Sequence, residues 1–239
     1  MLVNTNATII SDLKYGEVDL FVKCFVQKNR LKSYLPHGIL KSKKRKSKTS
    51  MSQLSSQLVL VAKHKDIGTL EYSQETRMLS TYRTMHTDVV KSKMVVVISK
   101  ILLNSIQKEE ENGSLYHYLE TTLNWLAHHE KFANFHLLFM LKLSRHLCFY
   151  SYDSNTNPDY FNMLDRVLQD METNNYCIEC QNYLVLKQLL CINFDELELL
   201  KLTKTNRTHF LEMLLLYYQF HIDAFKKPKS LAVLHEIFN

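Results

Sequence analysis

Six basic residues lie within eight consecutive positions of this 239-residue chain, in a segment that reads "KSKKRKSK". They are Lys41, Lys43, Lys44, Arg45, Lys46 and Lys48. Lysine ammonium groups meet phosphates as mobile point charges, and a guanidinium can bind one phosphate through two hydrogen bonds. No glycine-rich phosphate loop lies nearby, so the segment favours a nucleic-acid backbone over a bound nucleotide. A solvated loop that aids solubility, or a targeting signal, is the simpler alternative.

The charge of the whole first third points the same way. Residues 1–84 contain 15 Lys and Arg against 6 Asp and Glu, a net charge of +9, whereas the remainder contains 15 against 18, a net charge of −3. A positive field concentrated in one region attracts polyanions and raises their rate of encounter. Further basic residues extend this region, namely Arg30, Lys32, Lys63 and Lys65. We therefore expect the first third to bind nucleic acid.

Hydrophobic periodicity divides the chain into strands followed by helices. Val18, Leu20 and Val22 alternate with their neighbours, as a half-buried strand requires. Strands are expected at 7–14, 18–26, 31–40, 57–63 and 69–79. Apolar residues then recur three or four positions apart, which predicts helices near 89–102, 115–126, 133–150, 181–191, 194–202, 205–222 and 230–237. The segment 133–150 is apolar on most sides and is expected to be a central, buried helix, and Asn193 or Asp195 is expected near a helix N-cap.

The order of these elements predicts an α+β protein with two domains. Residues 1–82 would form a five-stranded, OB-fold-like β-barrel that binds DNA, and residues 83–239 an all-helical domain. Periodicity alone leaves an SH3-like barrel open. Single-strand binding also needs stacking platforms, for which the barrel offers Tyr15, Phe21, Phe25, Tyr34 and Tyr72. Core filling is the commoner role for any one strand aromatic.

Four stretches of the chain carry patterns of a known family. Residues 10–48 combine an apolar strand, a Y-x-E-x-D turn, a second apolar strand and a basic segment, in "ISDLKYGEVDLFVKCFVQKNRLKSYLPHGILKSKKRKSK". The later stretches read "FHLLFMLKLSRHLCFY", "LLCINFDEL" and "FKKPKSLAVLHEIF". Together they resemble RecO, the bacterial recombination-mediator family, and particularly its Bacteroidetes-type members. The resemblance covers nearly the whole chain and lies in patterns, not in a catalytic signature.

The resemblance implies a function as well as a fold. It implies an N-terminal OB-fold and a C-terminal helical domain, in agreement with the periodicity. It further implies binding of single- and double-stranded DNA, annealing of complementary strands, and loading of the RecA recombinase together with RecR onto DNA coated with single-strand-binding protein. The helical part would bind the acidic C-terminal tail of single-strand-binding protein.

The sequence departs from the family pattern at three local positions. Asn29-Arg30 stand where a turn glycine is usual, although asparagine tolerates the left-handed conformation. The segment "MSQLSS" lacks a proline that is common before the fourth strand. Cys148 occupies a helix-end position commonly held by glycine. These changes concern turn geometry and leave the family pattern intact.

Cys177 and Cys180 have the C-x2-C spacing of half a zinc site. Many members of the RecO family carry a four-cysteine zinc module in the helical domain. A complete site needs a second pair, and Cys148 and Cys191 are isolated. Because one C-x2-C is a weak signal and buried free cysteine is common, we predict neither zinc nor another cofactor.

The densest cluster of titratable side chains contains His128, His129 and His136 with Glu130. It lacks the H-E-x-x-H pattern of a metalloprotease, so surface or capping histidines are expected. No nucleophile elbow, kinase motif set or Walker A sequence is present. We therefore predict that the protein is not an enzyme, and a cryptic hydrolase is one alternative.

The helical part also combines aromatic and basic side chains. The aromatic residues are Phe132, Phe135, Phe139, Phe149, Tyr150, Phe220 and Phe225. An acidic peptide with an aromatic end fits an apolar slot rimmed by cations, so we assign the partner peptide to Lys142 and Arg145. For each aromatic taken singly, core filling is the favoured role.

Compartment and class follow from what the sequence lacks. No run approaches the roughly 18 apolar residues that span a bilayer, and residues 1–17 lack a signal-peptide pattern. Five dispersed cysteines do not suggest a disulfide framework. We expect a cytoplasmic, nucleoid-associated protein without membrane contact. A zinc-stabilised protein–protein adaptor, with a basic solubilising loop and no direct DNA role, is the alternative function.

Overall fold

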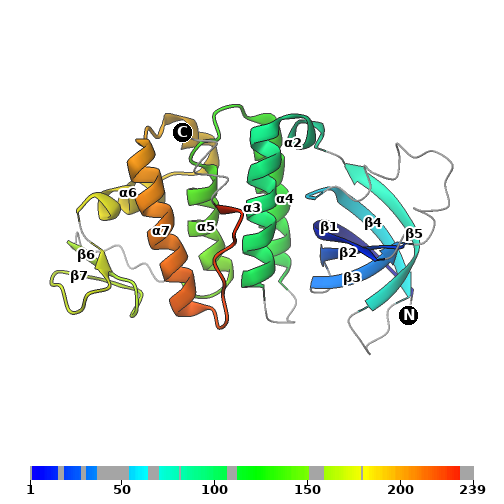
Figure 1. The fold of residues 1–239 in the computed structure, drawn as a ribbon, viewed down its shortest axis with the longest axis horizontal. Coiled ribbons are helices and arrows are strands. Elements are labelled where there is room, and N and C mark those ends of the chain that lie inside the picture. The colour runs from blue at the N-terminus through cyan, green and yellow to red at the C-terminus, as the bar shows by residue number, and fades with distance from the viewer. Residues whose placement is uncertain are drawn as a thin grey trace. The chain divides into compact units, whose positions relative to one another are not determined.

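The computed structural model describes residues 2–15, 19–27, 31–36, 54–63, 70–80, 82–106, 112–150, 159–178 and 180–231. The chain divides into two compact units, Met1–His128 and His129–Asn239. The first unit contains β1 (Leu2–Tyr15), β2 (Asp19–Val26), β3 (Leu31–Pro36), β4 (Gln57–Lys63), β5 (Leu70–Ser80), α2 (Arg83–Thr87), α3 (Val89–Ser105) and α4 (Gly113–His128). The second contains α5 (Phe135–His146), β6 (Tyr160–Asn162), β7 (Val167–Gln169), β8 (Cys177–Ile178), α6 (Cys180–Leu190), η1 (Phe194–Leu199) and α7 (Lys204–His221) (Figure 1).

The first five strands form a closed barrel. They pair in the order β1-β2-β3-β5-β4, and β1 also pairs with β4 (Figure 1). Every pair is antiparallel except β3 with β5, which is parallel. This order is that of an OB-fold and not of an SH3-like barrel. The predicted fold class is therefore confirmed, with β1 beginning earlier than expected.

The alternation of the strands fills the barrel with apolar side chains. The core consists of Ala7, Ile9, Val22, Cys24, Val26, Tyr34, Leu58 and Leu60, with Leu54 packed against it. Phe25 is also buried and stacks on Tyr116 of α4, with 6.5 Å between ring centres. Burial raises the pKa of the Cys24 thiol to about 12, so this cysteine stays protonated. Of the proposed stacking platforms, Phe25 and Tyr34 are core residues, whereas the side chains of Tyr15, Phe21 and Tyr72 lie outside the described part.

In the first unit, side chains cap the start of α3 and the end of α4. Asp88 begins α3, and its carboxylate accepts the backbone N–H groups of Val90 and Lys91 at 2.7 and 3.1 Å. The carbonyl of Ala127, in the last turn of α4, accepts from Thr84 Oγ1 at 2.7 Å and from the buried Lys91 Nζ at 3.1 Å. A cation at the negative end of a helix dipole is stabilising. Lys91 therefore joins the start of α3 to the end of α4.

Helix α5 forms the centre of the second unit, as the sequence predicts. Phe135, Leu137, Leu138 and Phe139 are fully buried in it. Helix α7 packs against α5, and the Tyr218 hydroxyl donates to the Met140 carbonyl at 2.7 Å (Figure 1). The aromatic surplus of this part is mostly core: Phe132, Phe135, Phe139, Phe149 and Phe225 are buried, and Tyr150 and Phe220 are half-buried.

The end of α5 depends on a cysteine in a conformation that favours glycine. Cys148 has a φ of 62°, and the Phe149 N–H donates to the Ser144 carbonyl at 3.2 Å, which is the closing bond of a Schellman motif. A side chain with a Cβ is disfavoured in this left-handed region by about 1–2 kcal/mol. The family's usual glycine at this position thus has a structural reason.

We expect Cys148→Gly to raise the free energy of unfolding by about 1 kcal/mol, because glycine adopts a positive φ without the Cβ penalty. The exposed Cys148 side chain adds little packing to lose. Urea unfolding of the two chains measures the difference. Cys148→Ala is the matched control, since it keeps the Cβ. An equal gain from alanine and glycine would contradict the backbone explanation.

The end of α7 introduces a pH dependence. His221 Nε2 lies 2.7 Å from the Met163 carbonyl oxygen, and burial lowers the pKa of this imidazole. Burial likewise lowers the pKa of His86 and His146. A folded pKa below the unfolded value of about 6.5 means that the unfolded chain takes up protons first, so stability falls as pH drops through this value.

We therefore expect the melting temperature to fall between about pH 7.5 and about pH 5.5, and His221→Gln to reduce that fall. The glutamine amide can still donate to the Met163 carbonyl but does not titrate. Thermal unfolding across this pH range tests the prediction. A variant with the same pH dependence as the natural chain would show that His221 is not one of the groups responsible.

Three features of the second unit differ from the predicted elements. The segment 194–202 was expected as an α-helix but forms the short 3₁₀-helix η1, which stops where Leu200 becomes extended. The strands β6, β7 and β8 form a three-stranded sheet that periodicity did not predict, because strands of two or three residues contain no period. The helix predicted at 230–237 lies mostly outside the described residues.

The predicted domain boundary between residues 82 and 83 stays a prediction. It falls between the barrel and α2, whereas the division into compact units falls after His128. Contacts between α3 and β1, and the stacking of Phe25 on Tyr116, explain why the helices α2 to α4 group with the barrel.

Candidate nucleic-acid interface

Strands β2 and β3 each present a lysine on the described part of the barrel. Lys23 is exposed and pairs with Ser33, while the next pair joins Cys24 to the half-exposed Lys32. Directly paired residues share a face and successive residues alternate, so Lys23 and Lys32 leave opposite faces of this ladder. Lys32 was predicted to bind DNA and Lys23 was not. In the described part of the barrel, the two side chains therefore do not lie side by side on one face.

Most of the predicted DNA-binding side chains lie outside the described residues. These are Arg30, Lys41, Lys43, Lys44, Arg45, Lys46, Lys48 and Lys65. Lys63 is the last residue of β4, where its backbone pairs with Leu2. Since β3 ends at Pro36 and β4 begins at Gln57, the basic run belongs to the connection between β3 and β4, as the sequence predicts. The role of these residues stays a prediction.

Sequence reasoning missed two exposed cations of the barrel. Lys23 alternates with the core residues Val22 and Cys24, so the period of two was the signal that could have found it. Arg77 on β5 is 77% exposed, and its guanidinium lies 3.0 Å from the Glu75 carboxylate. Exposed ion pairs of this kind contribute little, so Arg77 can exchange its partner for a phosphate.

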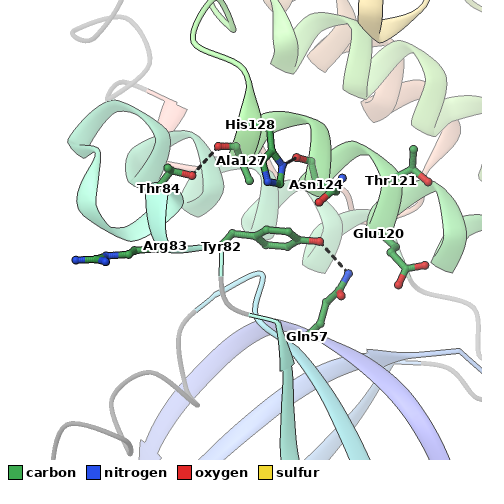
Figure 2. A pocket seen from close by; sticks show the side chains of 9 residues that line it. All are labelled: Gln57, Tyr82, Arg83, Thr84, Glu120, Thr121, Asn124, Ala127 and His128. Atoms are coloured by element: carbon green, nitrogen blue, oxygen red, sulfur yellow. Dashed lines mark hydrogen bonds between the residues drawn. The ribbon is translucent and has the colours of Figure 1, made fainter.

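A polar cleft of about 690 Å³ lies within the first unit, beside the start of β4. Its lining consists of Gln57, Tyr82, Arg83, Thr84, Glu120, Thr121, Asn124, Ala127 and His128. Figure 2 shows the Tyr82 ring across the middle of the cleft, with its hydroxyl toward Gln57 and with Arg83 extending away from the other side chains. The Gln57 amide donates to the Tyr82 hydroxyl at 3.0 Å.

The lining groups of this cleft form hydrogen bonds that maintain the fold. Thr84 Oγ1 donates to the Ala127 carbonyl, and His128 Nδ1 lies 2.8 Å from the Asn124 carbonyl oxygen. Catalysis by a nucleophile requires a hydroxyl or thiol within reach of a base. In this cleft the Thr84 hydroxyl donates to a main-chain carbonyl and the Tyr82 hydroxyl accepts from an amide, so neither of these two bonds joins a hydroxyl to a base.

Comparison with known proteins decides the family. The family described as "Recombination protein O C terminal" matches residues 86–232. The DNA repair protein RecO of Christiangramia forsetii is 46% identical over 238 residues, and the match spans 100% of both chains. The chain belongs to the RecO family. Proteins of the same name from Flavobacterium psychrophilum and Bacteroides fragilis are 39% and 28% identical over 239 and 243 residues, again over the full length of both chains.

Membership of the RecO family confirms the resemblance seen in the sequence. The matched region 86–232 begins at α2, so the barrel that precedes it is supported by the full-length relatives and by its own strand order. Within the described residues, none of the helices has the length and apolarity to cross a bilayer.

The predicted partner residues of this RecO-family chain share one face of α5. Lys142 Nζ donates to Asn193 Oδ1 at 3.0 Å and lies 5.8 Å from the centre of the Phe194 ring. Burial lowers the pKa of Lys142, and the nearby Arg145 guanidinium lowers it further. Arg145 itself is exposed. The Glu196 carboxylate acts in the opposite direction and raises the pKa of Lys142, so a carboxylate is already favourable near this cation.

The described cysteine and histidine side chains do not assemble a metal site. Within the described ranges, no group of three or more His, Cys, Asp or Glu side chains could hold a metal ion. Cys177 is half-buried, and Cys180 is the first residue of α6. Of the histidine cluster, His128 is exposed at the end of α4 and His136 is buried in α5.

Proposed function

We propose that this RecO-family protein binds DNA in recombinational repair without catalysing a reaction itself. Its full-length relatives are named DNA repair protein RecO. The observation that carries the proposal is the OB-order barrel with a basic run in the connection between β3 and β4.

The proposed DNA contacts are made to the phosphate backbone. They comprise Arg30, Lys32, Lys41, Lys43, Lys44, Arg45, Lys46, Lys48, Lys63 and Lys65. To these we add Lys23, because its side chain is exposed. Binding of this kind releases condensed counterions and reads no sequence. Both single- and double-stranded DNA are therefore expected ligands.

Backbone binding leads directly to strand annealing. Two complementary single strands repel each other through their phosphates, and a protein that neutralises those charges lowers the repulsion. Because the contacts leave base edges uncovered, the bound strands can still pair. We propose that the protein anneals complementary strands in this way and, together with RecR, helps to load RecA onto DNA coated with single-strand-binding protein.

The acidic C-terminal tail of single-strand-binding protein is the proposed ligand of Lys142 and Arg145. The support is the favourable effect of a carboxylate near Lys142 and the Phe194 ring beside this lysine. Carboxylates of the tail would pair with the cations, while an aromatic or aliphatic side chain of the tail would contact Phe194. This contact would bring the barrel to strands that are already coated.

An annealing assay tests the proposed function. Two complementary oligonucleotides, one carrying a fluorophore and the other a quencher, are mixed with the purified full-length chain, with and without single-strand-binding protein. We expect annealing to be faster with the chain in both cases, and Arg145→Glu to slow only the reaction with coated strands. Annealing that is no faster than without the chain would contradict the proposal.

A further inference from the structure

The small sheet of the second unit has a buried amide at its centre. Asn162, the last residue of β6, is fully buried and pairs with Val167 on β7 and with Cys177 on β8. A buried amide must find hydrogen-bond partners for its oxygen and for both of its protons, or destabilise the fold. The partners of Asn162 show how the two turns beside this sheet are held together.

The first turn wraps around the oxygen of Asn162. Asn162 Oδ1 accepts the backbone N–H groups of Leu164 and Asp165 at 3.0 and 3.2 Å. Arg166 follows with a φ of 61°, and its N–H donates to the Asn162 carbonyl at 2.9 Å. Successive N–H groups that point at one acceptor form a concave nest of the kind that holds anionic ligand atoms. Here the amide oxygen takes the place of such an atom.

The second turn, across the sheet, repeats part of this arrangement. Asn174 Oδ1 accepts the Tyr176 N–H at 2.8 Å, and the Cys177 N–H donates to the Asn174 carbonyl at 3.2 Å. The first turn runs from Asn162 to Asp165, and the second turn runs from Asn174 to Cys177. The Met163 N–H donates to the Tyr176 carbonyl at 3.1 Å and joins the two turns. In a four-ligand zinc module, each of two turns supplies two ligands that are separated by two residues.

Side-chain hydrogen bonds connect the two turns. Asn162 Nδ2 donates to Asp165 Oδ2 at 2.8 Å and to Thr173 Oγ1 at 3.1 Å. The Gln169 amide donates to the same threonine at 2.9 Å and to Cys177 Sγ at 3.3 Å. The polar groups of the two turns therefore satisfy one another, without an ion.

The side chains present do not fit zinc. Zinc in proteins takes thiolate, imidazole and carboxylate ligands, usually four in a structural site. Of the four turn positions only Asp165 and Cys177 carry such groups, while Asn162 and Asn174 carry amides whose oxygens already accept backbone N–H groups. Cys180, the first residue of α6, would bring the set to three, one short of a four-ligand site. The four-cysteine zinc module that the family resemblance implies thus finds only part of its ligand set in this chain.

We propose that residues 160–178 form a hydrogen-bonded knuckle, in which the side chain of Asn162 joins the two turns in place of a metal ion. The polar side chains Asp165, Gln169, Thr173 and Cys177 complete it. The second unit accordingly folds, and keeps any partner surface built on it, without metal.

The first test uses the natural full-length chain. We expect elemental analysis to find no stoichiometric zinc, and the melting temperature to be the same with and without a chelator. Asn162→Ala is expected to lower the melting temperature by about 5 °C, because it removes the four hydrogen bonds of the buried amide. Gln219→Ala, at an exposed position of α7, is the matched control and should change nothing. One zinc ion per chain, or a chelator-sensitive melting temperature, would overturn the proposal.

The second test rebuilds the metal site. The triple variant Asn162→Cys, Asp165→Cys and Asn174→Cys places cysteines at three turn positions beside the natural Cys177. Addition of Co²⁺ to the folded variant should produce the visible absorption of tetrahedral thiolate-bound cobalt, at one ion per chain, and restore the melting temperature. The same variant with Cys177→Ser should bind Co²⁺ more weakly. A folded triple variant without cobalt absorption would show that the turns lack the knuckle geometry.

Discussion

Alanine at Lys43, Lys44, Arg45 and Lys46 is expected to weaken binding of single-stranded DNA by about 10²- to 10³-fold near 0.1 M salt. Each phosphate contact on a single strand releases about 0.7 of a counterion, so four lost contacts remove nearly three decades of affinity at this concentration. The dependence of affinity on salt should weaken in parallel, because fewer ions are released on binding. Equilibrium titration of a fluorescent oligonucleotide measures both quantities.

A charge-matched control separates the basic run from net charge. Alanine at Lys201, Lys226, Lys227 and Lys229 removes the same number of charges from exposed positions of the second unit. This control is expected to change affinity much less. If both quadruple variants lost affinity equally, the basic run would have no special role. Circular dichroism of both variants checks that the barrel and the helices are intact.

The second large effect is expected in the core of the second unit. Phe135 is fully buried at the start of α5, and its ring lies 5.7 Å from that of Phe139 and 5.4 Å from that of Phe194. Phe135→Ala removes this aromatic contact and leaves a cavity, so the free energy of unfolding should fall by about 3–5 kcal/mol. Urea unfolding followed by circular dichroism gives the value.

Met171→Ala is the control for this experiment, because Met171 is 73% exposed. Its free energy of unfolding should stay within about 0.5 kcal/mol of that of the natural chain. A similarly small effect at Phe135 would mean that α5 is not the centre of the core.

The barrel could be predicted from the sequence because its strands are long and alternate. Val22 and Cys24 in β2, and Leu58 and Leu60 in β4, point inward in the structure as the period of two requires. Periodicity could not choose between an OB-fold and an SH3-like barrel, because that choice depends on the parallel pairing of β3 with β5. Pairing joins residues far apart in the chain and leaves no local pattern.

The second unit was predictable only where its helices are long. The apolar run of α5 was visible as a buried helix, whereas β6, β7 and β8 are too short for a period. The side-chain hydrogen bonds of Asn162 beside this sheet likewise leave no periodic pattern in the sequence. The end of α5 was partly visible, because a family glycine is replaced by Cys148, which the structure places at a positive φ.

Part of the candidate site could be predicted from the sequence, and part could not. Clustered charge made the basic run and the residues around it visible in the sequence, since charge density needs no knowledge of the fold. The cleft beside Gln57 and Tyr82 was not predicted, because its walls come from a strand, from α2 and from α4. The sequence suggested Lys142 as a cation beside aromatic residues, and its bond to Asn193 became visible only in the folded chain.

If the protein binds single-stranded DNA through its phosphates, its affinity must depend steeply on the salt concentration. Fluorescence anisotropy of a labelled oligonucleotide, titrated with the full-length chain at several salt concentrations, gives the dependence of log affinity on log salt. Six phosphate contacts predict a slope of about −4. A slope near zero, or the absence of binding at low salt, would contradict binding through the phosphates.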